Sequence, residues 1–460
     1  MILSHDDQAI IAQCTPKGSG AIALLRISGI AAFDLATKIS KLPSGASLCT
    51  LPSHTIHFGY VVDAAGYHID QVMFALMRGP KTFTGQDTVE ITTHNNPFIV
   101  QDIIAQAIMH GARLAQEGEF TKRAVLNNKI DLIQAEAINE LIHANTHMAL
   151  KKSLAQLEGS FSHWITTIEK ELIKALAYSE SSFEFIDEEM SFGRDIKNML
   201  NHTLATISSI KKTFDQQQQI RQGVRIAIIG SVNAGKSSLF NVLLNKERAI
   251  VTNIPGTTRD AIEAGIYKNS AYWTLIDTAG LRQTADMIEQ EGIKRSREQA
   301  HQADVILLVF DASRAQTDEE SLVYQELLKQ YGHKVIILHN KADMILGAYK
   351  DLENPESSVR ISTKTKHNID IVEQLIEEKI TTLFSSIESP FLLNQRHYNT
   401  LLALEKKLLA LCDMMSGQSI AYELVSYHLN DALAQLSELT GKSISEQGMD
   451  AVFREFCVGK

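Results

Sequence analysis

The stretch Gly230-Ser-Val-Asn-Ala-Gly-Lys-Ser237 follows a short apolar run at 225–229 and fits the pattern G-x-x-x-x-G-K-S/T. In this pattern the glycines let backbone N–H groups approach phosphate oxygens, and the helix that follows adds positive potential at its N-terminus. Lys236 neutralises phosphate charge, and the Ser237 hydroxyl can bind Mg²⁺. A chance match in a glycine turn is the alternative, but the apolar run before the stretch favours a phosphate-binding loop.

Two later motifs extend the nucleotide site. Asp277-Thr-Ala-Gly280 would bring a carboxylate to Mg²⁺ and a glycine N–H to the γ-phosphate. Asn340-Lys-Ala-Asp343 ends in a carboxylate that can accept hydrogen bonds from N1–H and the exocyclic amine of guanine. Adenine offers no matching donors, so this motif favours GTP over ATP. We therefore expect a GTPase domain with a parallel α/β sheet, rather than a Rossmann-like domain without nucleotide.

The predicted GTP contacts lie in five short segments. Pro255-Gly-Thr-Thr-Arg-Asp260 lies between the first two motifs, and the Thr258 hydroxyl could complete the Mg²⁺ shell when γ-phosphate is present. Without the flanking motifs, this segment would be an ordinary turn. The last segment begins at Ser362 and suits a loop that contacts the base. The full set is Asn233, Ala234, Gly235, Lys236, Ser237, Ser238, Thr252, Asn253, Ile254, Pro255, Gly256, Thr257, Thr258, Asp277, Thr278, Ala279, Gly280, Asn340, Lys341, Ala342, Asp343, Ser362, Thr363 and Lys364.

The group that usually orients the attacking water is replaced in this sequence. Leu281 follows Gly280, where Ras carries glutamine, and leucine cannot orient water. The polar segment that follows offers other candidates for orienting the water. The alternative is that these side chains are ordinary surface groups in contact with solvent. These candidates are Arg282, Gln283, Glu289, Gln290 and Glu291. The Asn233 amide could hold a monovalent cation against the phosphates, or it could only stabilise the loop through a hydrogen bond.

The composition narrows the class of protein. The chain has 460 residues, 21% charged and 44% hydrophobic, which predicts about three folded domains and excludes wholesale disorder. The net charge of −10 argues against a general nucleic-acid coat. The four cysteines form no C-x-x-C pair, which argues against a zinc finger or a disulfide scaffold. Without a long apolar run or a basic leader, we expect a soluble, cytoplasmic protein with no membrane partner.

Proline placement and hydrophobic patterning predict the domain organisation. No proline lies between Pro97 and Pro255 or after Pro390, so these stretches can hold long helices. We expect a multidomain protein of α+β and α/β class, with a Ras-like P-loop GTPase domain inserted into a helical domain. Its parts are an α+β domain at 1–121, helical parts at 122–217 and 384–460, and the GTPase domain at 218–383.

Motifs outside the nucleotide site complete a family pattern. They are Ala12-Gln-Cys-Thr-Pro16, Leu25-Arg-Ile-Ser-Gly29, the run from Thr82-Phe-Thr-Gly-Gln-Asp87 to Glu90, Gly118-Glu-Phe-Thr121 with Arg123, Asn127-Asn-Lys-Ile-Asp131, Gln134-Ala-Glu-Ala137 and Phe456-Cys-Val-Gly-Lys460. With these motifs the chain resembles the tRNA modification GTPase family MnmE, also called TrmE, over essentially its full length.

The resemblance implies a reaction and its partners. The family works with an FAD-dependent partner, MnmG, which carries the FAD in a heterotetramer. Together they install an aminomethyl or carboxymethylaminomethyl group on C5 of the wobble uridine, position 34, of certain tRNAs. The N-terminal domain is similar to folate-binding aminomethyltransferase domains, forms a constitutive homodimer, and binds a 5-formyl- or methylene-tetrahydrofolate derivative. GTP hydrolysis is potassium-stimulated and accompanies pairing of the two GTPase domains.

The resemblance also implies roles for individual residues. Glu289 falls at the catalytic glutamate, with Glu291 as the alternative if the register slips. The implied Mg²⁺ ligands are Ser237 and Thr258, and the implied K⁺ ligands are Asn233, Thr252, Ile254 and Thr257. The implied folate contacts are Arg26, Glu90, Lys129 and Lys460, which outside the family pattern would be ordinary surface charges. Cys457 is either a reactive thiol or a packing residue.

Some positions depart from the family pattern, mostly near the implied folate site. They are Gln86, Asn95, Asn96, Gln116, Glu117 and, in the potassium loop, Asn253. A second hypothesis is a ribosome-associated or assembly GTPase that acts as a nucleotide-controlled switch. The segment from Glu90 to Lys129 and the ending Cys457-Val-Gly-Lys460 favour the modification enzyme. No GxxG-centred KH pattern follows the GTPase domain, which also argues against the switch.

Overall fold

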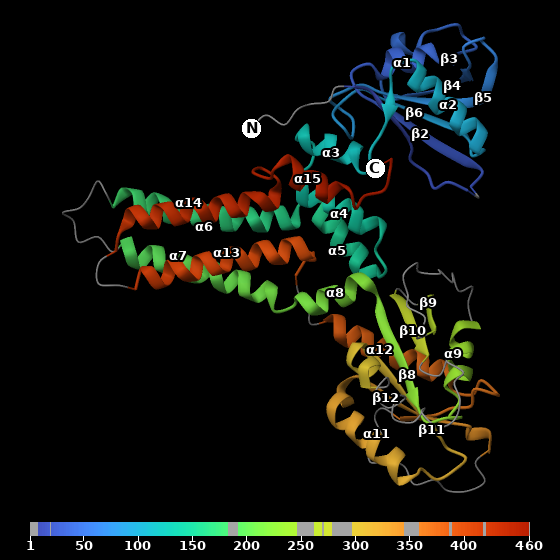
Figure 1. Cartoon of the computed structure of the whole chain (residues 1–460), viewed down its shortest axis with the longest axis vertical. Helices are drawn as coiled ribbons and strands as arrows, with labels where there is room; N and C mark the ends of the chain where they lie inside the picture. Colours follow the sequence, from blue (N-terminus) through green and yellow to red (C-terminus); the bar gives the residue numbers. More distant parts are fainter. Residues whose placement is uncertain are drawn as a thin grey trace. The chain divides into compact units, whose positions relative to one another are not determined.

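The computed structural model describes residues 8–18, 20–182, 192–245, 262–268, 271–277, 297–344, 358–385, 389–416 and 420–459 (Figure 1). The chain divides into two compact units. The first comprises Met1–Asn139, Ala155–Ala205 and Asn399–Lys460, and the second comprises Glu140–Leu154 and Thr206–Tyr398. None of the helices in the described ranges is long and apolar enough to cross a membrane.

The first unit contains a seven-stranded sheet in the order β3-β4-β5-β6-β2-β1-β7. The strands are β1 (Ile10–Gln13), β2 (Ile22–Ser28), β3 (Ser40–Lys41), β4 (Thr55–Val62), β5 (His68–Met77), β6 (Thr88–His94) and β7 (Arg113–Leu114). Along β2, buried and more exposed residues largely alternate, as in a sheet with one covered face. The helices α1 (Ala32–Lys38) and α2 (Pro97–Met109) contribute to its core, so this region is α+β as expected.

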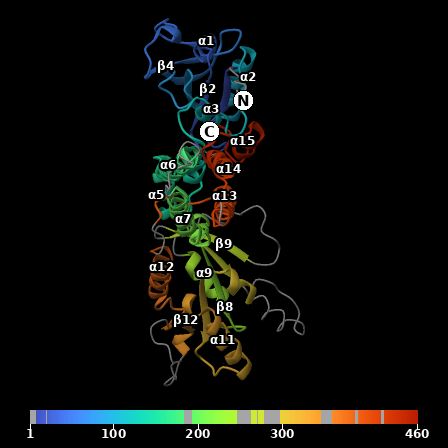
Figure 2. The same ribbon diagram turned by 90° about the vertical axis from the view of Figure 1, so that its left-hand side faces the viewer.

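Long helices make up the rest of the first unit. Apolar residues of α6 (Ser160–Ser181) recur at alternating spacings of four and three, which produces a continuous stripe. The helix α14 (Tyr422–Thr440) carries a matching stripe and packs along α6 (Figures 1 and 2). The remaining helices that lie wholly or partly in this unit are α3 (Glu119–Leu126), α4 (Leu132–Ile142), α5 (His147–Leu157), α7 (Phe192–Lys211), α13 (Gln395–Met414) and α15 (Glu446–Phe453).

The second unit is built on a six-stranded sheet in the order β13-β12-β11-β8-β10-β9. The strands are β8 (Val224–Gly230), β9 (Ile262–Lys268), β10 (Ala271–Asp277), β11 (Val305–Asp311), β12 (Val335–Asn340) and β13 (Ser358–Arg360). The pair β9–β10 is antiparallel and the other pairs are parallel. The parallel α/β sheet expected from the sequence is therefore present.

Helices cover both faces of this sheet. The helices α9 (Lys236–Asn245) and α12 (Ile369–Ser385) contribute to the core on one face, and α11 (Asp318–Tyr331) contributes to the core on the other. Consecutive residues of β8 point to opposite faces of the sheet, since Ile228 belongs to the core under α9 and α12 and Ile229 belongs to the core under α11.

The polar stretch before β8 forms α8 (Phe214–Gln222). Its Ile220 is fully buried in the core that α9 and α12 share. Short 3-10 turns are η1 (Leu48–Thr50), η2 (Gly332–Lys334) and η3 (Ala342–Met344).

Candidate nucleotide-binding site

Parallel strand pairing brings the predicted motifs to one edge of the second sheet. The strand β8 ends at Gly230, β10 at Asp277, and β12 at Asn340. The register pairs Gly230 with Val309 in β11, and Asn340 with Asp311 at the end of the same strand. Because parallel strands end at the same edge, motifs more than 100 residues apart in the sequence form one site.

The phosphate loop has the backbone that its glycines predict. Gly235 has φ +97, and a Cβ added there would lie 2.1 Å from Nδ2 of Asn340. A Cβ on Gly230 would lie 2.3 Å from the carbonyl oxygen of Val309. Asn233 also has a positive φ, 62°, a conformation that asparagine adopts more readily than most residues. The loop is therefore packed tightly against β11 and the guanine motif, and only glycine fits at these two positions.

Asn340 connects three of the predicted segments. Its side chain is buried; Nδ2 donates to the carbonyl oxygen of Ala234 at 2.8 Å, and Oδ1 accepts from the Thr363 amide at 3.1 Å. The Asp343 carboxylate accepts a hydrogen bond from the Ser362 hydroxyl at 2.6 Å, which lowers the pKa of Asp343. An ionised, exposed Asp343 keeps acceptor capacity for the two donors of a guanine edge.

The two lysines of the site are held by neighbouring oxygens. Lys236 Nζ donates to the carbonyl oxygens of Gly230 and Ser231, both at 2.8 Å. Lys341 Nζ lies 2.6 Å from Oδ2 of Asp311, which ends β11. Burial alone would raise the pKa of Asp311, but the hydrogen bonds from Lys341 and Ser313 hold it below its ordinary value. The Asp311 contact was not predicted, because its strand carries no nucleotide motif.

The described residues around the phosphate loop include side chains with oxygen atoms of the kind that bind Mg²⁺ and K⁺. Ser237 is exposed in the first turn of α9, and the strand β10 ends at Asp277, so both chain positions lie at the edge of the sheet where Mg²⁺ is expected. The Asn233 side chain is exposed at the phosphate loop, with an amide oxygen suited to K⁺. Many of the predicted residues lie outside the described ranges: Thr252, Asn253, Ile254, Pro255, Gly256, Thr257, Thr258, Thr278, Ala279, Gly280, Arg282, Gln283, Glu289, Gln290, Glu291 and Lys460.

In the first unit, two predicted folate contacts form a pair. Arg26 and Glu90 are register partners on β2 and β6, and Arg26 Nη2 lies 2.7 Å from Glu90 Oε1. The Arg26 guanidinium also lies 5.4 Å from the ring centre of Phe120. Lys129 instead donates to the carbonyl oxygen of Pro80 at 2.8 Å. Cys457 is exposed beside Val458, which forms a bridge with Glu117.

Asn253 lies outside the described ranges, and the other residues that depart from the family pattern have partners nearby. Gln86 Oε1 accepts from Arg123 at 2.9 Å, and Asn95 Nδ2 donates to the carbonyl oxygen of Gly18 at 3.0 Å. Asn96 caps α2 by accepting from the Phe98 amide. The Gln116 amide donates to Glu119 at 2.9 Å. These positions therefore maintain local structure.

The strand order, the phosphate loop and the guanine motif define a P-loop G domain. The family descriptions "GTP-binding protein TrmE N-terminus" and "MnmE helical domain" match residues 9–129 and 132–457. Relatives named tRNA modification GTPase MnmE include those of Geobacillus thermodenitrificans, at 37% identity over 98% of this chain and 99% of the relative, and Aquifex aeolicus, at 36% over 98% and 100%. The chain belongs to the MnmE family of tRNA modification GTPases.

A third relative, from Bacillus subtilis, is 36% identical over 98% of this chain and 99% of its own length. Among solved structures, Aquifex aeolicus Era bound to GDP and AlF4⁻ matches 34% of this chain and 56% of its own, at 28% identity and a TM-score of 0.27. The family assignment rests on the full-length relatives and the two family descriptions.

Proposed function

We propose that this chain couples GTP hydrolysis to modification of the wobble uridine, position 34, of certain tRNAs. The observation that carries the proposal is the match of 98% of the chain to relatives named tRNA modification GTPases. In the proposed reaction an aminomethyl or carboxymethylaminomethyl group is attached to C5 of the uridine. An FAD-dependent, MnmG-like partner carries the FAD and joins two copies of this chain in a heterotetramer.

In the hydrolysis step, water attacks the γ-phosphorus, the bond to the β,γ-bridging oxygen breaks, and GDP and phosphate leave. Lys236 would exchange the carbonyl oxygens of Gly230 and Ser231 for phosphate oxygens and neutralise their charge. Asp343 would hold the guanine edge, and Glu289 would orient the water. Bound Mg²⁺ and K⁺ would supply further positive charge to the phosphates. The proposed ligands are Ser237 and Thr258 for Mg²⁺, and Asn233, Thr252, Ile254 and Thr257 for K⁺.

The N-terminal domain would hold the one-carbon donor, a 5-formyl- or methylene-tetrahydrofolate derivative. A pterin presents an amino-pyrimidine edge that a carboxylate can accept, and its glutamate tail needs cations. The Arg26–Glu90 pair places both charges on adjacent strands, which supports this assignment. Lys129 and Lys460 complete the proposed set. We also propose the four-segment organisation given above and a homodimer formed through the N-terminal domain.

The test is mass spectrometry of tRNA nucleosides from a strain that lacks the gene for this chain. We expect the wobble uridines of this strain to lack the C5 substituent. The wild-type gene should restore the substituent. A gene that carries Asp343→Asn should not restore it, because that variant should fail to bind GTP. Arg297→Ala is the matched control and should restore the modification, because Arg297 forms a half-exposed ion pair with Glu326 and no contact found for it in the described ranges reaches the phosphate loop. Normal wobble uridines in the deletion strain would instead favour the assembly GTPase.

A further inference from the structure

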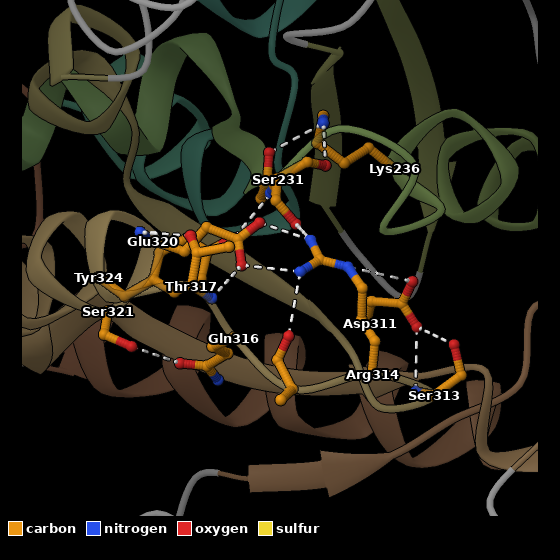
Figure 3. Close-up of polar contacts among 12 residues, drawn as sticks. Ser231, Lys236, Asp311, Ser313, Arg314, Gln316, Thr317, Glu320, Ser321 and Tyr324 are labelled. Atoms are coloured by element: carbon orange, nitrogen blue, oxygen red, sulfur yellow. Dashed lines mark hydrogen bonds and ion pairs between the residues drawn. The ribbon is translucent and has the colours of Figure 1, made fainter.

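A polar cluster that the nucleotide motifs do not include lies against the phosphate loop (Figure 3). It consists of Ser231 in the loop, Asp311 at the end of β11, Arg314 after that strand, and Glu320 and Tyr324 in α11. We call this set the Arg314 cluster. Arg314 Nη2 donates to Ser231 Oγ at 3.3 Å and to Glu320 Oε1 at 2.5 Å, while Nη1 donates to Glu320 Oε2 at 3.0 Å. One guanidinium therefore joins the loop to α11.

Several groups hold Ser231, including the Ala234 amide, which donates to the Ser231 carbonyl oxygen at 3.3 Å. The Ser231 amide donates to Tyr324 Oη at 2.7 Å, its hydroxyl accepts from Arg314, and its carbonyl accepts from Lys236 at 2.8 Å. The last contact involves the lysine that binds phosphate in a P-loop. When Lys236 turns to a phosphate, the Ser231 carbonyl loses this partner but keeps the Ala234 amide, and the side chains of Arg314 and Tyr324 still hold the residue.

Arg314 is itself fixed in place. Its partner Glu320 caps α11 by accepting from the Thr317 amide at 3.0 Å, while the Glu320 amide donates to the Thr317 hydroxyl at 3.2 Å. Arg314 Nε also lies 3.9 Å from Asp311, whose carboxylate binds Lys341 of the guanine motif at 2.6 Å. A chain of polar contacts, from 2.6 to 3.9 Å long, thus runs from the phosphate loop to the base-binding segment.

We propose that Arg314 is a positioning residue that holds the phosphate loop, through Ser231, in the form that binds nucleotide. The loop binds phosphate through backbone N–H groups that must converge on the ligand, so fixing one of its residues beforehand lowers the ordering cost of binding. The Arg314 contact belongs to this form of the loop, whether free or bound to nucleotide, and is absent from other loop conformations, so it favours the form that binds. It therefore affects nucleotide affinity rather than the chemical step. This inference rests on the proposed binding of GTP.

A second ion pair on α11 provides a matched control. Arg297 Nη2 lies 2.5 Å from Glu326 Oε2, and both side chains are about half exposed. Like Arg314, Arg297 binds a glutamate of α11, but the contacts found for it in the described ranges include none to the phosphate loop. If Arg314 only stabilised the surface of α11, then Arg314→Ala and Arg297→Ala would have the same effect.

The experiment measures the affinity of the full-length protein for fluorescent mant-GDP, together with the steady-state kinetics of GTP hydrolysis. For Arg314→Ala we expect the Kd for mant-GDP and the KM for GTP to rise about three- to tenfold, with kcat within about twofold of wild type. Arg297→Ala should leave all three values unchanged. Arg314→Lys should recover part of the affinity, because an ammonium can bond to Ser231 but cannot form the two-pronged contact with Glu320.

A double-mutant cycle with Ser231→Ala tests whether Arg314 acts through that hydroxyl. We expect Ser231→Ala to weaken binding and to add little in the Arg314→Ala background. Additive effects, an unchanged Kd in Arg314→Ala, or an equal rise in Arg297→Ala would overturn the proposal. Thermal melts show whether each variant folds. If Arg314→Ala does not fold, the Kd values of Ser231→Ala and Arg314→Lys decide whether the proposal stands. A wild-type protein that does not bind mant-GDP would refute the GTP site itself.

Discussion

The hydroxyl of Ser362 donates a hydrogen bond to Oδ1 of Asp343 at 2.6 Å, which joins two segments that the sequence separates by 19 residues. The contact holds the Asp343 carboxylate near the carboxyl ends of β12 and β13. Asn340, at the end of β12, also donates a hydrogen bond to Ala234 of the phosphate loop. The position of the Asp343 carboxylate is thus coupled to the position of the phosphate loop.

Replacement of Asp343 by asparagine should change the base preference of the protein. The amide presents a donor where guanine also presents a donor, so GTP affinity should fall by about 100-fold or more, while xanthosine triphosphate should gain affinity. Competition binding against mant-GDP measures both values. Unchanged GTP affinity would contradict the base-reading role. Asp318→Asn, at the start of α11, is the control and should keep the GTP preference.

Replacement of Glu289 by alanine should abolish hydrolysis without loss of GTP binding. A group that orients or deprotonates water contributes about 10²- to 10⁴-fold to a rate, and alanine removes it. Single-turnover hydrolysis and mant-GDP binding separate the two effects. Glu291→Ala should hydrolyse GTP normally. The opposite pattern, with Glu291 essential and Glu289 dispensable, would place the catalytic glutamate two residues later.

Exchange of K⁺ for Na⁺ at constant ionic strength should slow GTP hydrolysis by about tenfold, because the smaller cation would fit the proposed K⁺ ligands less well. Asn233→Ala should hydrolyse GTP slowly in both salts. Initial rates in potassium, sodium and choline chloride measure the effect. Equal rates of the wild-type protein in all three salts would remove the cation site from the mechanism.

Glu119 should contribute pH-dependent stability to the first unit. Its buried carboxylate accepts from Arg113 at 2.6 Å and from Arg123 at 3.1 Å. Burial alone would raise the pKa of Glu119, but these arginines and the Gln116 amide lower it below the ordinary 4.5. Because the folded pKa is depressed, the stabilisation is complete above the unfolded value and is lost as the pH falls through the folded value.

Glu119→Gln should therefore destabilise this region by about 2 kcal/mol at pH 7, with a difference from wild type that narrows below pH 4.5. Hydrogen exchange of peptides covering β7 and α3, compared at matched pH, measures it. Asp450→Asn, which removes the exposed pair with Lys122, should cost less than about 1 kcal/mol. An equal loss in both variants, or a Glu119→Gln effect that does not change with pH, would contradict the assignment.

Much of the second unit could be predicted from local sequence. Apolar runs of strand length precede Gly230, Asp277 and Asn340, and each becomes a strand of the sheet. The capping box from Thr317 to Glu320 was a further local signal, and it could have located the start of α11. Such features can be predicted because they depend on the spacing of residues along one segment of the chain.

The Arg314 cluster could not be predicted in this way. Arg314 and Ser231 are 83 residues apart, and neither belongs to the set of expected GTP contacts. They meet because β11 lies directly beside β8 in the sheet, which brings the end of one strand against the loop of the other. The partnership of Arg26 with Glu90 likewise depends on the pairing of β2 with β6.

The sequence by itself determined the class of each domain and the order of the nucleotide motifs, and it predicts the choice of guanine through Asp343. Strand periodicity, the glycines of the phosphate loop and the chemistry of a carboxylate act within a few residues. Only the tertiary structure decided which charges face one another, such as Lys341 with Asp311 and Arg314 with Ser231 and Glu320. These contacts depend on strand order and register, which follow from how buried faces pack across the whole sheet and leave no local pattern in the chain.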